Sequence, residues 1–257
     1  MLKIMNDQKY NWIVVGGGIA GISIAEILSN VGFDWLVVDL EHTTISIEQA
    51  GELIRTIELS GVPSLVRLTS NDENQIKRVM DAGAQGIVVP MVITAEDAES
   101  AIAATRYPSL GTRGVGLARA QGYGASFQEY LSWQSDIEKG PVVIVQIEHI
   151  SAVNNLKEIL SVKGVDAFII GPYDLSCSME IPGEFDRPEF IKAMDDILQA
   201  GLKAGCPAGL HIVEPDTDRL KKAIREGYRF IAYSVDMRML DVSARAGVQI
   251  VKEIKSQ

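Results

Sequence analysis

Cysteine is scarce in this sequence: Cys177 and Cys206 are the only two among 257 residues. Two cysteines are too few for a disulfide framework or a four-thiolate metal site, which predicts a protein of a reducing compartment. Long apolar runs are missing as well. No run reaches the roughly 18 residues of a membrane span, and residues 1–12 lack the apolar stretch and cleavage site of a secretory signal. We therefore expect a cytoplasmic protein that does not use a membrane.

Positive charge is also limited. The chain has 24 Lys and Arg residues against 34 Asp and Glu residues, for a net charge of −10 at pH 7. The basic residues are scattered among carboxylates, whereas nucleic acids are bound by clustered cationic faces. We therefore expect no nucleic-acid partner, and an anionic small molecule would need a local cation in its site.

Short apolar runs alternate with helix-like segments, some of which follow typical helix starts such as Ser46 and Thr94. The eight runs span 12–16, 35–39, 64–68, 86–90, 142–148, 167–171, 208–211 and 230–234. The helix-like segments lie near 20–30, 46–58, 72–82, 94–104, 151–160, 187–204, 215–226 and 238–253. Continuous apolar strands are typical of a parallel sheet covered by helices, and eight such units close into a (β/α)8 TIM barrel. We predict an α/β fold in which residues 1–257 form a single barrel domain.

One long stretch interrupts the repeat. Residues 106–136 lie between the fourth and fifth runs and are rich in Gly and aromatic residues. A segment of this length in a compact domain is typically a functional loop or a disordered one.

The first strand–helix unit offers a different interpretation. Gly16, Gly18 and Gly21, followed by Asp39, match the fingerprint of a dinucleotide-binding unit and favour an FAD- or NAD-dependent oxidoreductase. The same glycines suit any tight turn from strand to helix. A two-domain oxidoreductase would also show a second domain, whereas this chain continues its repeat. We therefore expect neither FAD nor NAD and keep the oxidoreductase as the alternative.

Polar residues follow the ends of the apolar runs, where a barrel places its chemistry. They are Asp39, Glu41, His42, Arg67, Gln146, Glu148, Asp174, His211, Ser234 and Asp236. Carboxylates gathered at one mouth need an offsetting cation, and oxygen ligands suit Mg²⁺ or Mn²⁺. Carboxylates at strand ends also cap helices and anchor loops, so this signal for a metal is weak on its own. No predicted strand contains a lysine, so we expect no Schiff-base lysine and favour metal-assisted chemistry.

A resemblance to a known family emerges from several motifs taken together. The segments GFDWLVVDLEH, VRL, DAGAQGIVVPMV, TRYPSLGTRGVG, QIE and FIIGPYDLSCSM, in this order between about residues 30 and 240, resemble the HpcH/HpaI aldolase family. The resemblance implies a lyase, a class II aldolase that uses Mg²⁺, Mn²⁺ or Co²⁺. Such an enzyme reversibly cleaves a 4-hydroxy-2-oxo acid to pyruvate and an aldehyde through a pyruvate enolate stabilised by the metal. It also implies a modified (β/α)8 barrel in a homo-oligomer, typically a hexamer of dimers that exchange a C-terminal helix.

The resemblance further assigns the residues that bind metal and substrate. Glu148 and Asp174 resemble the two metal-binding carboxylates, and Asp174 also borders the substrate. Gln146 resembles a polar residue that orients the bound ligand and water. Arg67 resembles the arginine that binds the pyruvyl oxygens, and its charge together with the metal would stabilise the enolate. Arg67 could instead be an ion-pair partner inside the barrel.

The remaining assignments concern proton transfer and the mouth of the site. His42 resembles the catalytic base, with Asp39 as the carboxylate that orients it, although His42 could instead cap a helix. Asp81 resembles an acidic residue lent near a neighbouring subunit's site, but it could serve only packing or assembly. Tyr173 fills a position where many relatives carry alanine and is expected to narrow the mouth. His211 would contact a distal substrate group or be structural. A relative with other chemistry at the same metal enolate site, and a barrel that binds a 2-oxo acid without cleaving it, stay open as alternatives.

Overall fold

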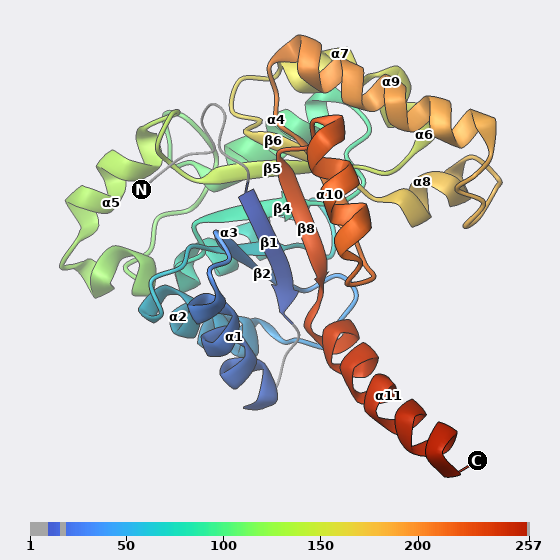
Figure 1. Cartoon of the computed structure of the whole chain (residues 1–257). Helices are drawn as coiled ribbons and strands as arrows, with labels where there is room; N and C mark the ends of the chain where they lie inside the picture. The colour runs from blue at the N-terminus through green and yellow to red at the C-terminus, as the bar shows by residue number, and fades with distance from the viewer. Residues whose placement is uncertain (1–9, 16–18, 256–257) are drawn as a thin grey trace.

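Parallel strands form the centre of the fold (Figure 1). The computed structural model describes residues 10–15 and 19–255. Its strands are β1 (Tyr10–Val15), β2 (Trp35–Asp39), β3 (Ser64–Arg67), β4 (Gly86–Val89), β5 (Val142–Ile147), β6 (Ala167–Ile170), β7 (Ala208–Ile212) and β8 (Phe230–Val235). Each strand pairs in parallel with the next along the chain, and β1 pairs with β8, so the sheet closes on itself. The predicted α/β class with a parallel, barrel-like sheet is confirmed.

Helices connect the strands and cover the outside of the sheet (Figure 1). They are α1 (Ile19–Val31), α2 (Ile47–Leu59), α3 (Glu73–Ala82), α4 (Ala95–Thr105), α5 (Phe127–Ser135), α6 (Ile150–Asn154), α7 (Leu156–Ser161), α8 (Pro172–Ser178), α9 (Pro188–Ala204), α10 (Thr217–Glu226) and α11 (Asp236–Lys255). Ser46 and Thr94 each form a capping box at the start of α2 and α4, which confirms two predicted helix starts. The predicted helix near 151–160 is two short helices, because Asn155 leaves the helical path and its side chain donates to the Ile93 carbonyl.

The barrel interior explains how the strands deliver polar side chains to one mouth. A small apolar cluster fills the interior and includes Val37, Leu65 and Ile144. Successive side chains on a strand alternate between the two faces, so the residues two positions further on share the inward face. Those residues are Asp39, Arg67 and Gln146. A larger apolar cluster lies between the sheet and the helices and holds the strands in place.

The long interruption at 106–136 is structured. It contains the short 3-10 helix η1 (Arg119–Gly124) and α5. The side chain of Arg113 is fully buried here, where it donates to the Tyr130 hydroxyl and to the Asp81 carboxylate. The Tyr107 hydroxyl accepts from the Gln121 amide at 2.7 Å. The Arg113–Asp81 contact joins the segment to α3, and the other two contacts hold the segment together, so the disordered alternative does not hold.

The C-terminal helix α11 extends away from the barrel beyond the end of β8 (Figure 1). Its exposed apolar side chains are Met237, Leu240, Val248, Ile250, Val251 and Ile254. Most of these side chains recur at helical spacing along one stripe. Among residues 10–15 and 19–255, no helix is both long and apolar enough to cross a bilayer.

Candidate active site

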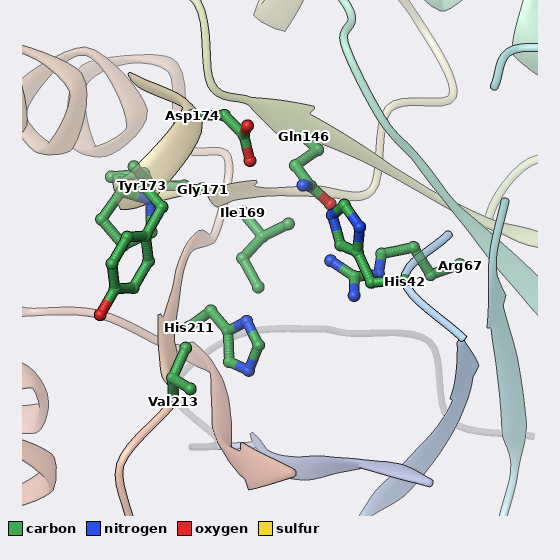
Figure 2. Close-up of a pocket in the computed structure, with 11 residues that line it drawn as sticks. His42, Arg67, Gln146, Ile169, Gly171, Tyr173, Asp174, His211 and Val213 are labelled. Atoms are coloured by element: carbon green, nitrogen blue, oxygen red, sulfur yellow. The ribbon is translucent and has the colours of Figure 1, made fainter. Parts of the chain in front are cut away.

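A cavity at the carboxyl end of the strands collects most of the predicted site residues (Figure 2). The residues that line it include His42, Arg67, Gln146, Tyr173, Asp174 and His211. Asp39 and Glu148 are more deeply buried. Each is hydrogen-bonded to a residue that lines the cavity, Asp39 to Arg67 and Glu148 to Gln146. Of the eight residues that the sequence assigned to the site, only Asp81 lies away from this cavity in the fold.

Arg67 and Asp39 form a two-point ion pair at the ends of β3 and β2. Their positions are paired across the parallel ladder. Arg67 Nε donates to Asp39 Oδ1 at 2.8 Å, and Arg67 Nη2 donates to Asp39 Oδ2 at 2.7 Å. Burial alone would raise the pKa of Asp39, but the hydrogen bond and charge of Arg67 outweigh it and hold that pKa below its usual range. The pair therefore stays charged and fixes the plane of the guanidinium.

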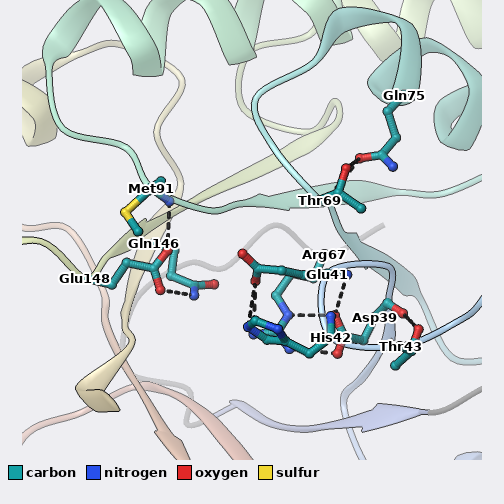
Figure 3. A network of polar contacts seen from close by, with 10 residues as sticks. All are labelled: Asp39, Glu41, His42, Thr43, Arg67, Thr69, Gln75, Met91, Gln146 and Glu148. Atoms are coloured by element: carbon teal, nitrogen blue, oxygen red, sulfur yellow. Dashed lines mark hydrogen bonds and ion pairs between the residues drawn. The ribbon is translucent and has the colours of Figure 1, made fainter. Parts of the chain in front are cut away.

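Glu41 is the site residue to which the sequence gave no role (Figure 3). Its Oε2 lies 3.3 Å from Arg67 Nη1 and 3.8 Å from His42 Nε2. Burial raises the pKa of Glu41 to about 7, and the negative charges of Glu148, Asp39 and Asp174 add to this shift while Arg67 opposes it. Glu41 therefore exchanges its proton near neutral pH beside an exposed histidine. The sequence signal that could have identified Glu41 is its position two residues after Asp39, just beyond the same strand end.

The contact expected between Asp39 and the His42 ring is replaced by a different arrangement. The Asp39 carboxylate accepts from the backbone N–H of Glu41 at 3.0 Å and of His42 at 3.5 Å, in addition to binding Arg67. It therefore orients the turn that carries His42 rather than the imidazole itself. Both carboxylate oxygens bind Arg67, and Oδ1 also accepts from the backbone of the turn. The carboxylate near the His42 ring belongs to Glu41.

Glu148 is held by two donors just beyond the end of β5. Its Oε1 accepts from the Met91 backbone N–H at 2.8 Å, and its Oε2 accepts from the Gln146 side-chain amide. Burial raises the pKa of Glu148, the donors Gln146 and Met91 lower it, and the Asp174 charge raises it further. Gly171 leaves room for this carboxylate, because a Cβ at that position would lie 2.5 Å from Glu148 Oε2.

The donor set fits a hard divalent cation. Asp174 lies in the first turn of α8 and, like Gln146, borders the cavity (Figure 2). Together with Glu148 it supplies carboxylate oxygens in a place where the carboxylates repel one another. Within the described part of the chain, no group of three or more His, Cys, Asp and Glu residues could hold a metal. A two-carboxylate site is what Mg²⁺ commonly uses, because it retains several water ligands.

Asp81 is not brought to this mouth. It lies in the last turn of α3, where its carboxylate accepts from buried Arg113. Helices of a parallel barrel run opposite to the strands, so the end of α3 lies at the amino end of the sheet. In its own chain, Asp81 is therefore a partner of Arg113 and not a member of the site.

His211 from β7 and Tyr173 from the start of α8 also line the cavity. Burial lowers the pKa of His211 to about 4, and the nearby positive charge of Arg67 adds to this effect, so the imidazole is neutral at physiological pH. Tyr173 is 55% exposed, and its ring packs edge-on against Phe185 with 5.0 Å between ring centroids. Both residues border the cavity, which is compatible with contact to a distal part of a substrate.

The dinucleotide interpretation falls on a part of the chain that is only partly described. Gly16 and Gly18 lie outside the described residues, and Gly21 lies inside α1. The turn on which the oxidoreductase alternative depends therefore lies outside the described residues.

A parallel barrel whose mouth gathers carboxylates, an arginine and a histidine is the arrangement of a barrel enzyme. Comparison with known proteins makes the class specific. The model of the HpcH/HpaI aldolase/citrate lyase family matches residues 19–241. The chain belongs to this family, as the sequence motifs predicted.

Individual relatives agree with this assignment. The chain is 36% identical over 228 residues to a hydroxypyruvate/pyruvate aldolase of Sagittula stellata, which covers 88% of each chain. It is 38% identical over 247 residues to a 4-hydroxy-2-oxo-heptane-1,7-dioate aldolase of Salmonella typhimurium, covering 95% of this chain and 90% of that one. The crystal structure of an HpcH/HpaI aldolase/citrate lyase family protein from Burkholderia cenocepacia J2315 matches with a TM-score of 0.88, 31% identity and 96% coverage of both chains. The predicted class, an aldolase among the carbon–carbon lyases, is confirmed.

Proposed function

We propose that this chain is a divalent-metal-dependent aldolase that reversibly cleaves a 4-hydroxy-2-oxo acid to pyruvate and an aldehyde. The observation that carries the proposal is the convergence at one mouth of two oxygen donors, Glu148 and Asp174, with a fixed arginine and an exposed histidine. Relatives that are named as aldolases of pyruvate and of a 4-hydroxy-2-oxo acid support the same substrate class.

Glu148 and Asp174 would hold the metal, and Mg²⁺, Mn²⁺ and Co²⁺ are the candidates. The bound ion would supply a Lewis acid beside the 2-oxo group of the substrate. Gln146 donates to Glu148, and this contact fixes the direction of that carboxylate. Its remaining polar atoms border the cavity and can orient substrate or water.

Arg67 would bind the pyruvyl oxygens. It borders the cavity, its side chain is only 11% exposed, and its plane is fixed by Asp39. When the C3–C4 bond breaks, negative charge develops on the pyruvyl fragment. A cation that is already oriented stabilises this charge without reorganisation.

His42 would act as the base. Its side chain is 64% exposed on the open side of the cavity, where a 4-hydroxyl can approach, and Glu41 Oε2 lies 3.8 Å from its Nε2. The imidazole would take the hydroxyl proton as the aldehyde forms and return a proton in the condensation direction. Glu41 would stabilise the imidazolium, so the carboxylate beside the ring would be Glu41 and not Asp39, which the resemblance gave as the carboxylate that orients His42.

The finer expectations about architecture and assembly belong to the same proposal. We propose a single (β/α)8 domain over residues 1–257 in a cytoplasmic homo-oligomer, with a hexamer built from dimers as the expected form. Helix α11 would be the exchanged element, since its apolar side chains are exposed in the single chain. Asp81 would then lie near a neighbouring subunit's site. The absence of bound FAD or NAD stays a prediction, which the absorbance spectrum of the purified protein tests.

The test of the reaction is pyruvate release from a panel of 4-hydroxy-2-oxo acids, followed with lactate dehydrogenase. We expect turnover with Mg²⁺, Mn²⁺ or Co²⁺, none after treatment with EDTA, and recovery when metal is restored. Borohydride added with pyruvate should trap no covalent adduct, because no lysine is expected to form an imine. Binding of a 2-oxo acid without any release of pyruvate would indicate a non-catalytic barrel and overturn the proposal.

A further inference from the structure

The turn after β4 contains a residue with a strained backbone. Met91 has a φ of 54°, in the left-handed region that glycine adopts readily and that other residues rarely adopt. Its side chain is 48% exposed, so burial of that side chain does not account for the conformation. A residue of this kind persists only where the surrounding structure holds it in place, and such residues are concentrated at functional sites.

The backbone N–H of Met91 binds one of the two proposed metal ligands (Figure 3). It donates to Glu148 Oε1 at 2.8 Å. The other oxygen of this carboxylate, Oε2, accepts from the Gln146 amide. Glu148 is only 2% exposed, so these two donors set the direction in which its carboxylate faces the cavity.

The left-handed conformation reconciles this hydrogen bond with the packing of the next residue. Val92 is 1% exposed and belongs to the large apolar cluster between the sheet and the helices. Because φ is the rotation about the bond from N to Cα, it determines where the chain continues once the N–H of Met91 points at Glu148. An ordinary negative φ would turn the N–H away from Glu148 or direct Val92 away from the core.

Two side chains hold the rest of this turn. The Asp97 carboxylate accepts from the backbone N–H of Ile93 at 3.0 Å and of Thr94 at 2.8 Å. The side chain of Asn155, at the junction of α6 and α7, donates to the Ile93 carbonyl at 3.0 Å. Glu148 and Asn155 both follow β5, so the chain after β5 binds the turn after β4 at two points.

We propose that Met91 and Asn155 are positioning residues for the metal site. Asn155 holds the turn after β4, and the left-handed backbone of Met91 directs its N–H at Glu148, which fixes this carboxylate for the ion. The inference rests on the proposed metal-dependent function and goes beyond it, because both residues act through Glu148 and not on the metal or the substrate.

Two substitutions of Met91 test the role of its backbone. Met91→Gly adopts a positive φ without strain, whereas Met91→Val places a β-branched side chain where a positive φ is most costly. We expect the Kd for Mn²⁺, measured by isothermal titration calorimetry, to rise about tenfold or more in Met91→Val and to stay within about threefold of the wild type in Met91→Gly. Leu59→Val is the control, because Leu59 is 79% exposed at the end of α2, away from the site.

Asn155→Ala tests the contact that holds the turn and leaves Met91 and Glu148 unchanged. We expect the Kd for Mn²⁺ to rise about threefold or more, because the released turn no longer fixes the carboxylate. Asn30→Ala in α1 is the matched control, since the exposed Asn30 side chain also donates to a backbone carbonyl, that of Glu26 at 2.8 Å. The binding stoichiometry reports the folded fraction, so a loss of folded protein is separated from a loss of affinity.

The outcomes separate the inference from the function on which it rests. Wild-type affinity in Met91→Val or in Asn155→Ala would overturn the role proposed for that residue and leave the aldolase standing. Equally weakened binding in Met91→Gly and Met91→Val would assign the effect to the lost side chain and overturn the role of the backbone. If the wild type binds no Mn²⁺, the proposed metal site fails and the inference fails with it.

Discussion

Among single residues, Arg67 organises the charges of the site. It joins the end of β3 to the end of β2 through Asp39 and reaches Glu41 in the turn that follows β2. A lysine could not replace it, because the planar guanidinium binds two carboxylates in fixed directions at once, whereas an ammonium is a point charge. The geometry of His42 therefore depends on Arg67 indirectly, through the two carboxylates at this turn.

Glu41 makes the stability of the protein depend on pH. Its folded pKa of about 7 lies above the ordinary value of 4.5. The folded state therefore binds the proton more tightly than the unfolded state, and stability falls as the pH rises from about 4.5 through 7. Glu41→Gln removes this loss. We therefore expect the substitution to raise the free energy of unfolding, relative to the wild type, more at pH 8 than at pH 5, by at most about 3 kcal/mol.

Urea unfolding of the EDTA-treated protein at the two pH values measures this gain. Glu52→Gln is the matched control, because Glu52 is an exposed glutamate on α2 outside the site. A gain of equal size in both variants, or a larger gain at pH 5, would show that Glu41 does not hold a proton in the folded state. With metal restored, Glu41→Gln should also slow pyruvate release, because the His42 imidazolium loses its partner.

Much of the charge arrangement could be predicted from strand periodicity. Asp39, Arg67 and Gln146 converge because each stands two positions beyond an inward apolar residue of a parallel strand. The partner of His42 could not be predicted in this way. The partner of His42 depends on the conformation of the turn after β2 and on whether Asp39 binds Arg67 or the imidazole. The spacing of residues in the sequence determines neither of these.

At the scale of elements, the start of α8 positions two parts of the site. Gly171 precedes α8, and its missing side chain lets Glu148 approach, while Asp174 extends from the first turn of the helix. The φ of Gly171 is −93°, so an alanine there would suffer no backbone strain. The glycine is needed for space and not for its conformational freedom.

Gly171→Ala therefore tests the geometry of the metal site without changing a donor. The new Cβ would lie 2.5 Å from Glu148 Oε2 and 3.0 Å from Glu148 Cβ, so the carboxylate must move away from Met91 and Gln146. We expect Mn²⁺ affinity, measured by isothermal titration calorimetry, to fall about tenfold or more, as for changes around metal ligands generally. Gly51→Ala in α2, where the nearest atom would lie 3.9 Å away, should leave the affinity unchanged. Wild-type affinity in Gly171→Ala would place the metal elsewhere.

Two other elements have features that could not be predicted from the sequence. The segment 106–136 has no hydrophobic period, and its order comes from distant partners, such as buried Arg113 with Asp81. The break between α6 and α7 likewise follows from a hydrogen bond of Asn155 to Ile93, 62 positions away. Contacts of this kind are set by tertiary packing and leave little signal in local sequence.

For the whole molecule, the main open point is what covers α11, because the apolar stripe of this helix is exposed in the single chain. Leu240 and Val251 lie on this stripe, and Gln249 lies on the opposite side of the helix. Exposed apolar side chains that follow one another along a helix mark a surface that another chain is expected to cover. Nothing in the strand pattern could have identified that partner, since a single chain's periodicity does not say which surface covers the stripe.

The double variant Leu240→Asp, Val251→Asp tests the exchanged helix. The two side chains are 66% and 50% exposed, so the substitutions should not unfold a single chain, but they would place charges in an interface between chains. We expect sedimentation velocity to show a smaller assembly than the wild type forms. Gln249→Asp, a single charge change on the opposite side of the same helix, should leave the assembly intact. An unchanged mass in the double variant would exclude α11 as the exchanged element.

The central claim is that carbon–carbon cleavage depends on a metal held by Glu148 and Asp174. The most direct measurement is the rate of pyruvate release from a 4-hydroxy-2-oxo acid as Mn²⁺ is added back to EDTA-stripped protein, compared between the wild type and Glu148→Gln. The account predicts a rate that rises from background and saturates for the wild type and stays at background for Glu148→Gln, whose amide keeps the shape of the side chain but not its charge. Full activity in the stripped wild type, or saturable recovery to the wild-type rate in Glu148→Gln, would contradict it.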